Sequence, residues 1–78
     1  MEKLNNKENT NGHSLENKKG IEEHIMAAKL FEAAAKHHRD AAKFHEEGNQ
    51  DEAFKSTIIA LGNQRIGAEC QNALSFLY

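Results

Sequence analysis

The amino-acid sequence predicts an all-α fold in which two long helices form an antiparallel hairpin. Three copies of a seven-residue unit follow one another from Ala27 to Glu47, and each copy begins with Ala-Ala-Lys. Seven residues span two turns of an α-helix, so each residue type in the unit recurs on one face. Proline is absent from all 78 residues, and Gly48 interrupts the pattern where a turn would join the helices.

The N-terminal segment is predicted to be a disordered leader. Asn, Lys and Glu dominate residues 1–19, in which Leu4 and Leu15 are the only apolar residues after Met1. Such a segment cannot bury enough apolar surface to offset the entropy that it loses on ordering. We therefore expect the hairpin to occupy residues 20–78.

The first helix is predicted over residues 20–47. Glu22 and Glu23 lie in its first turn, where the helix dipole favours acidic side chains. Lysines and acids four residues apart recur on one face, which indicates a face in solvent. Another face carries an alanine at every seventh position and would allow a partner helix to approach closely. This alanine face comprises Ala27, Ala34 and Ala41.

A short turn at residues 48–49 is expected to lead into a second helix over residues 50–77. Gly48 suits the left-handed conformation that ends many helices, and Asn49 can cap the helix that follows. A turn this short brings the second helix back antiparallel to the first.

The second helix carries two apolar stripes. One partner helix can cover only one of them, and soluble monomers rarely expose a large apolar patch. We therefore expect two hairpins to pair as a homodimer in a four-helix bundle. The stripe expected to face the first helix comprises Ala53, Phe54, Thr57, Ala60, Leu61, Gln64, Gly67, Ala68, Gln71 and Leu74, and the second stripe comprises Ile59, Ile66, Cys70, Ala73 and Leu77.

Two glycines, Gly62 and Gly67, fall inside the second helix. Each costs ~1 kcal/mol relative to alanine in a helix interior. Close approach of another helix would explain them, and a kink or fraying of the helix is the alternative.

The predicted function is that of a non-enzymatic protein–protein interaction module or a small self-associating helical protein. Its partner is expected to be a second copy or another protein, and neither a nucleic acid nor a membrane, because a net charge of −2 gives no field that would attract a polyanion. No cofactor is expected, since phosphate-binding loops, dinucleotide fingerprints and EF-hand patterns do not occur. The predicted interaction surface comprises Ile59, Ile66, Cys70, Ala73, Leu74, Phe76, Leu77 and Tyr78.

Histidine-dependent metal binding is the alternative function, because four of the five histidines fall in the first helix. Two ligands on one helix need a spacing of three or four residues to face one ion. His37 and His38 are adjacent, and His38 and His45 are seven residues apart, so neither pair fits within one chain. His38 and His45 of two chains could meet across a dimer axis. Half-buried histidines at the edge of a helix interface are the simpler interpretation.

A single cysteine, Cys70, fits a reducing compartment. No helix N-terminus lies near it to activate the thiol, so a buried small apolar residue is predicted, with a disulfide across a dimer axis as the alternative. Since the sequence shows neither a signal peptide nor a long apolar run, we expect a cytoplasmic protein. Enzymatic activity is not expected.

The turn and the start of the second helix resemble part of a tetratricopeptide repeat. Residues 48–54 supply the glycine, the polar stretch and the packing alanine of that pattern, and Ala60 and Leu61 supply its Ala-Leu pair. The closing proline of the repeat is missing, and the first helix is longer than a repeat helix. A single hairpin cannot form the concave groove of repeat arrays, so no peptide-binding residues are carried over.

Residues 27–64 resemble small bacterial helical-hairpin proteins that are rich in Ala-Ala-Lys-His-His units. In those proteins a Glu-Glu-Gly-Asn turn leads to a second helix rich in Ala and His. This chain has the unit and the turn, but Ile58, Ile59 and Ile66 stand in a second helix that has few histidines. The resemblance implies a hairpin and a bacterial or phage origin, and the loss of histidines weakens a metal-storage role.

Overall fold

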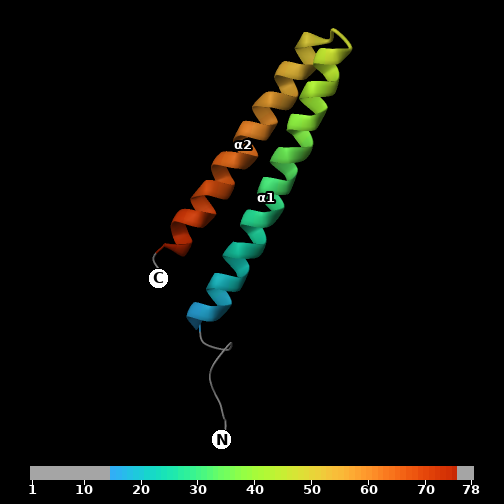
Figure 1. Ribbon diagram of the computed structural model, residues 1–78. Coiled ribbons are helices and arrows are strands. Elements are labelled where there is room, and N and C mark those ends of the chain that lie inside the picture. The colour runs from blue at the N-terminus through green and yellow to red at the C-terminus, as the bar shows by residue number, and fades with distance from the viewer. Residues whose placement is uncertain (1–14, 76–78) are drawn as a thin grey trace, which may run out of the picture.

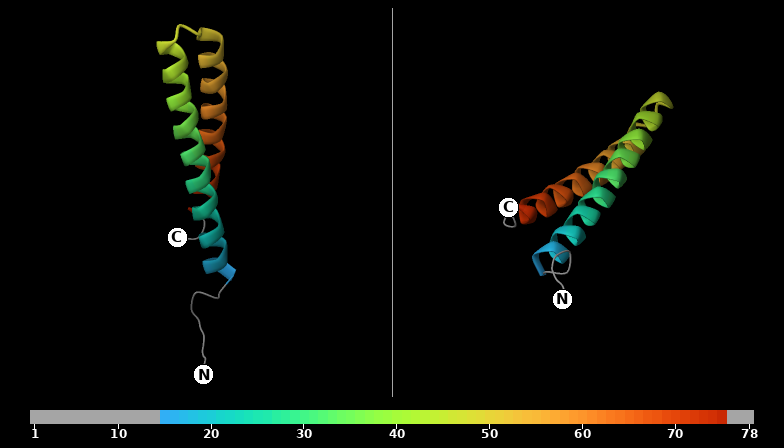
Figure 2. Two further views of the ribbon diagram at one scale, coloured as in Figure 1. Left: turned by 90° about the vertical axis from the view of Figure 1, so that its right-hand side faces the viewer. Right: turned by 60° about the horizontal axis from the view of Figure 1, so that its bottom comes forward.

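The computed structural model describes residues 15–75 and shows a hairpin of two helices (Figure 1). Helix α1 spans Leu15–Glu46 and helix α2 spans Gln50–Leu74, with 32 and 25 residues. The helices run antiparallel and lie side by side along the whole of α2, as a second direction of view also shows (Figure 2). The predicted all-α hairpin is therefore confirmed.

Helix α1 begins five residues before the predicted boundary. The segment Leu15–Lys19 was expected to belong to the disordered leader but is helical, so the prediction is wrong for these residues. Gly20 suggested a helix start, yet it is buried inside α1, seven residues before the buried Ala27. Gly20 therefore continues the seven-residue spacing of the buried alanines rather than marking a helix boundary. Residues 1–14 of the predicted leader lie outside the described residues.

A glycine-based C-cap ends α1. Gly48 has a φ of +76°, its N–H donates to the His45 carbonyl at 3.0 Å, and the Asn49 N–H donates to the Phe44 carbonyl at 2.8 Å. This pair of hydrogen bonds defines a Schellman motif with glycine at the left-handed position. The Asn49 side-chain oxygen then accepts a hydrogen bond from the Glu52 N–H at 3.3 Å and caps α2. The turn therefore forms as the sequence predicts.

Replacing Gly48 with alanine is expected to destabilise the hairpin by about 1 kcal/mol, because a Cβ is unfavourable at positive φ. Urea unfolding followed by circular dichroism measures the change. Gly48→Asn is the matched control, since asparagine tolerates the left-handed region, and it should lose less stability. Equal stability of the alanine variant and the wild-type chain would contradict the capping role.

Small residues at a seven-residue spacing form the seam between the helices. No large side chain is fully buried in the described part of the chain, and alanine dominates the core. Such a seam allows the two backbones to approach closely, because little side-chain volume separates them. Leu74 is the one large apolar side chain in it, 6% exposed, and Ser56 adds a buried polar residue. The seam comprises Gly20, Ala27, Ala34 and Ala41 on α1 and Ala53, Ala60, Gly67 and Leu74 on α2.

The two glycines inside α2 differ in their surroundings. A Cβ on Gly67 would lie 2.8 Å from Cε1 of the Phe31 ring, so glycine at this position makes room for an aromatic side chain of α1. A Cβ on Gly62 would meet nothing within 4 Å. Close helix approach therefore explains Gly67 and does not explain Gly62.

Two large residues of the predicted inward stripe are exposed. Phe54 and Leu61 were expected to face the first helix, but they are 66% and 52% exposed. That expectation is wrong because the seam is narrow: only one residue in seven is deeply buried, and each of these side chains follows such a residue and points away. No described helix has the combination of length and apolar character that crossing a bilayer requires.

Candidate interaction surface

One side of the hairpin collects apolar residues from both helices. Successive residues of a helix are rotated by ~100°, so the residue before each seam residue lies to one side of the seam. Because α1 and α2 are antiparallel, the residues that precede seam residues lie on the same side of the hairpin in both helices. So do residues four positions before a seam residue. We call this surface the isoleucine face. Its apolar residues are Met26, Leu30 and Ala33 of α1 and Ile59, Ile66, Cys70 and Ala73 of α2, and the polar residues Glu23, His37, Asp40 and Asn63 lie on the same side.

The contact between Glu23 and Cys70 supports this placement. Each of these residues lies four positions before a seam residue, Glu23 on α1 and Cys70 on α2. The nearby Glu23 carboxylate raises the pKa of the Cys70 thiol, which requires that the two positions lie close together on one side.

The large side chains of the isoleucine face are about half exposed. Met26 is 49% exposed, and Ile59 and Ile66 are each 47% exposed. Cys70 and Ala73 are half-buried between them and the seam. Four of the residues predicted for the interaction surface, Ile59, Ile66, Cys70 and Ala73, thus lie together on this face.

Of the remaining predicted surface residues, the structure describes Leu74. Leu74 lies in the buried seam with 6% of its surface exposed, so it packs within the hairpin and its place in the predicted surface is corrected. Phe76, Leu77 and Tyr78 lie outside the described residues. The isoleucine face also contains three residues of α1 that were not predicted: Met26, Leu30 and Ala33. The seven-residue pattern of the first helix could have indicated them.

The opposite side of the hairpin carries both polar and apolar residues. Residues one position after seam residues lie there and include Ile21, Phe54 and Leu61, each more than half exposed. Residues four positions after seam residues lie there: His24, Phe31, His38 and His45 on α1, and Thr57, Gln64 and Gln71 on α2. His38 and His45 are exposed and two helical turns apart. Within residues 15–75 no group of three potential ligands could hold a metal ion. Binding by His38 and His45 of two chains therefore stays a prediction that needs a second molecule.

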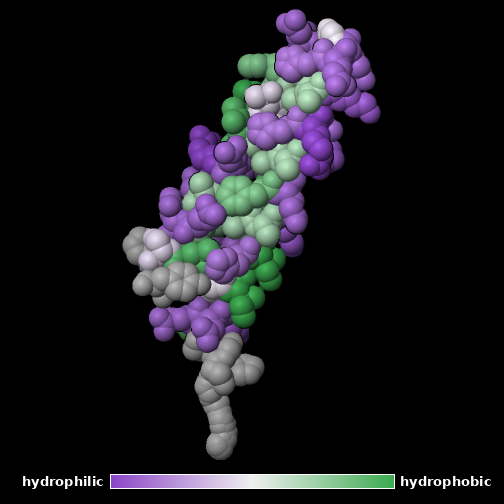
Figure 3. Space-filling model, viewed as in Figure 1, coloured by the Kyte–Doolittle hydropathy of each residue, from purple (hydrophilic) through white to green (hydrophobic). Residues whose placement is uncertain are grey.

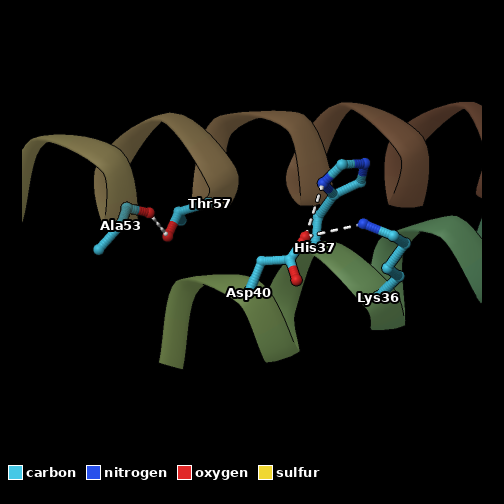
Figure 4. A network of polar contacts seen from close by, with 5 residues as sticks. All are labelled: Lys36, His37, Asp40, Ala53 and Thr57. Carbon is cyan, nitrogen blue, oxygen red and sulfur yellow. Dashed lines mark hydrogen bonds and ion pairs between the residues drawn. The ribbon is translucent and has the colours of Figure 1, made fainter. Parts of the chain in front are cut away.

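A local ion-pair cluster occupies the middle of α1 (Figure 4). Lys36 Nζ donates to Asp40 Oδ2 at 2.9 Å, and His37 Nδ1 lies 3.7 Å from the same oxygen. The hydrogen bond from Lys36 lowers the pKa of the Asp40 carboxyl. On α2, the Thr57 hydroxyl donates a hydrogen bond to the backbone carbonyl oxygen of Ala53, one turn earlier, at 2.8 Å. The four side chains Lys36, His37, Asp40 and Thr57 thus make their contacts within their own helix, where they stabilise it locally.

Burial and a neighbouring acid make Cys70 a weak nucleophile. Burial raises the pKa of the Cys70 thiol, and the hydrogen bond and negative charge of Glu23 raise it further. A raised pKa leaves less thiolate near neutral pH, and the thiolate is the reactive form. Cys70 is half-buried, so it is more exposed than the buried residue that the sequence predicts.

We expect Cys70 to alkylate more slowly than an unperturbed cysteine, with an apparent pKa above the ordinary value. Iodoacetamide rates measured across alkaline pH give this apparent pKa. Replacing Glu23 with Gln should move it back toward the ordinary value, because the carboxylate charge is removed. An apparent pKa below that of free cysteine would contradict this account of the thiol.

Comparisons with protein-family models, with curated proteins and with solved structures found no match to this chain. The resemblances noted in the sequence therefore stay predictions.

Proposed function

We propose that this chain is a non-enzymatic, self-associating helical protein in which two hairpins pair through their isoleucine faces as a four-helix bundle. One observation supports this most: Met26, Ile59 and Ile66, from both helices, present large half-exposed apolar side chains on one side of the hairpin. The seam, in contrast, buries only small residues and Leu74. The apolar surface that would normally form a core is therefore on the outside.

Energetics favour a second copy over an isolated hairpin. Scaffolds of this size rarely gain enough stability from one small core, and they often use oligomerisation. Burying an isoleucine side chain fully contributes about 1.5–3 kcal/mol, of which Ile59 and Ile66 still have about half to gain. Pairing through the isoleucine face would supply this burial twice, once in each copy.

The face is also suited to its own copy. A twofold axis parallel to the helices lays α2 of each hairpin over α1 of the other, and each contact occurs twice. Ile59 and Ile66 project from α2, whereas α1 offers the small Ala33 on the same face. The large α2 side chains of one copy would thus lie over Met26, Leu30 and Ala33 on α1 of the other.

Replacing Ile66 with Glu tests the proposal. A charge buried in the bundle interface is strongly unfavourable, so the variant should sediment as a monomer at concentrations at which the wild-type chain is a dimer. Gln64→Glu is the matched control: it adds the same charge two residues away, at an exposed position on the side opposite the isoleucine face, and should leave the mass unchanged.

Far-UV circular dichroism should show that both variants remain helical at high protein concentration, which separates loss of pairing from loss of folding. Equal masses for the wild-type chain and Ile66→Glu would refute pairing through the isoleucine face. If both variants sedimented as monomers, an added negative charge anywhere on α2 would prevent pairing. That result would also count against the isoleucine face.

A further inference from the structure

Helix α2 has a third apolar surface, which pairing through the isoleucine face would leave uncovered. Phe54, Ile58 and Leu61 recur at spacings of four and three residues and are 66%, 53% and 52% exposed. Arg65 follows four residues later on the same stripe. We call these four residues the outer ridge. In Figure 3, hydrophobic atoms are visible along the edge of the molecule over α2.

We propose that the outer ridge is a second docking site, which binds an amphipathic helix of a partner protein that carries an acidic side chain. Anchors at i, i+4 and i+7 are the spacing by which helices recognise one another in grooves. The ridge points away from the seam and away from the isoleucine face, so both surfaces can be occupied together. The proposal does not depend on self-association.

An open hollow beside the ridge gives the partner helix a place to approach. It is lined by Ile58, Leu61, Gly62 and Arg65. A Cβ on Gly62 would meet nothing within 4 Å. The chain thus has a glycine in a helix interior, at a cost of ~1 kcal/mol, that no contact within the hairpin requires. Contact with another molecule explains it: without a side chain at this position, a bulky residue of the partner can lie against the α2 backbone.

The charge of the ridge indicates which helix fits. Arg65 is the one basic residue on α2 after Lys55, and no carboxylate of residues 15–75 lies within ion-pair distance of it. A partner helix that covers the hollow would desolvate this guanidinium, and an aspartate or glutamate on the helix would compensate it by a charge-assisted hydrogen bond. A basic residue at the same place would be repelled, so the site should discriminate by charge.

A displayed library of 20-residue amphipathic helices, with leucines fixed on one face and Glu, Lys, Gln or Ala varied at its borders, provides the probe. We expect selection on the full chain to enrich helices that carry Glu beside the leucine face. Synthetic peptides of the enriched sequences, measured by fluorescence anisotropy, should lose at least tenfold in affinity when that Glu is replaced by Lys. No enrichment, or enrichment without Glu, would overturn the proposal.

Variants of the chain locate the binding site. Gly62→Leu fills the hollow with a residue that favours helix and should abolish peptide binding while circular dichroism stays unchanged. Arg65→Glu should reverse the preference, so that the Lys peptide binds better. Ile66→Glu, which disrupts the proposed pairing face, should bind the peptides as the wild-type chain does. Peptide binding that survives Gly62→Leu, or that is lost in Ile66→Glu, would place the site elsewhere and refute the outer ridge.

Discussion

Replacing Ala60 with leucine is expected to destabilise the hairpin by about 3 kcal/mol, at the upper end of the usual cost of overpacking. Ala60 lies near the middle of the seam and is completely buried. The seam residues of α1 nearest the middle are Ala27 and Ala34, which are also buried. A leucine there has no free volume to enter and must push the two backbones apart along several turns.

Ala68→Leu is the matched control, because Ala68 is exposed on the same helix and both substitutions keep a strong helix former. Thermal and urea unfolding of both variants, followed by circular dichroism, give the difference in the free energy of unfolding. Equal stabilities would contradict the alanine seam. A more stable Ala60→Leu variant would do so too, since it would mean that position 60 faces an unfilled space.

The two glycines inside α2 should respond oppositely to alanine. Gly62→Ala is expected to stabilise the chain by about 0.5–1 kcal/mol, because alanine favours the helix and nothing lies within 4 Å of its Cβ. Gly67→Ala should lose this gain and destabilise the chain, since its Cβ would come within 2.8 Å of Phe31 Cε1. Gly67→Leu, with more atoms to accommodate, should cost about 2–3 kcal/mol by overpacking.

A double-mutant cycle separates the contact from helix propensity. If the Phe31 ring is the obstacle, Gly67→Ala in a Phe31→Ala background should become stabilising, as Gly62→Ala is in the wild-type background. Additive effects of the two substitutions would show that the ring moves aside without cost. That result would remove close packing as the reason for glycine at position 67.

The sequence predicted the backbone well because its signals are local. The seven-residue spacing of Ala27, Ala34 and Ala41 identified the buried face of α1, and the Gly48-Asn49 pair identified the turn. Both depend on helix periodicity and capping within a few residues. The start of α1 was wrong because Gly20 has two interpretations in a sequence, a boundary or a packing site, and only the position of α2 decides between them.

The face of each α2 residue was harder to predict, because it depends on how closely the helices pack. The predicted inward stripe held ten residues, which suits a wide interface between large side chains. The observed seam is narrow, so Phe54 and Leu61 are outside it, whereas Leu74, which the stripe also held, is inside. Met26 and Ile66 share one face because of the way the two antiparallel helices are aligned. The residue pattern of one helix alone does not reveal this alignment.

The mass of the wild-type chain in solution, measured by light scattering across a concentration series, tests self-association most directly. The proposal predicts a mass that rises with concentration and levels off at twice the chain mass of 8.8 kDa. A mass of 8.8 kDa at every concentration, with the helix content of the hairpin retained, would contradict it.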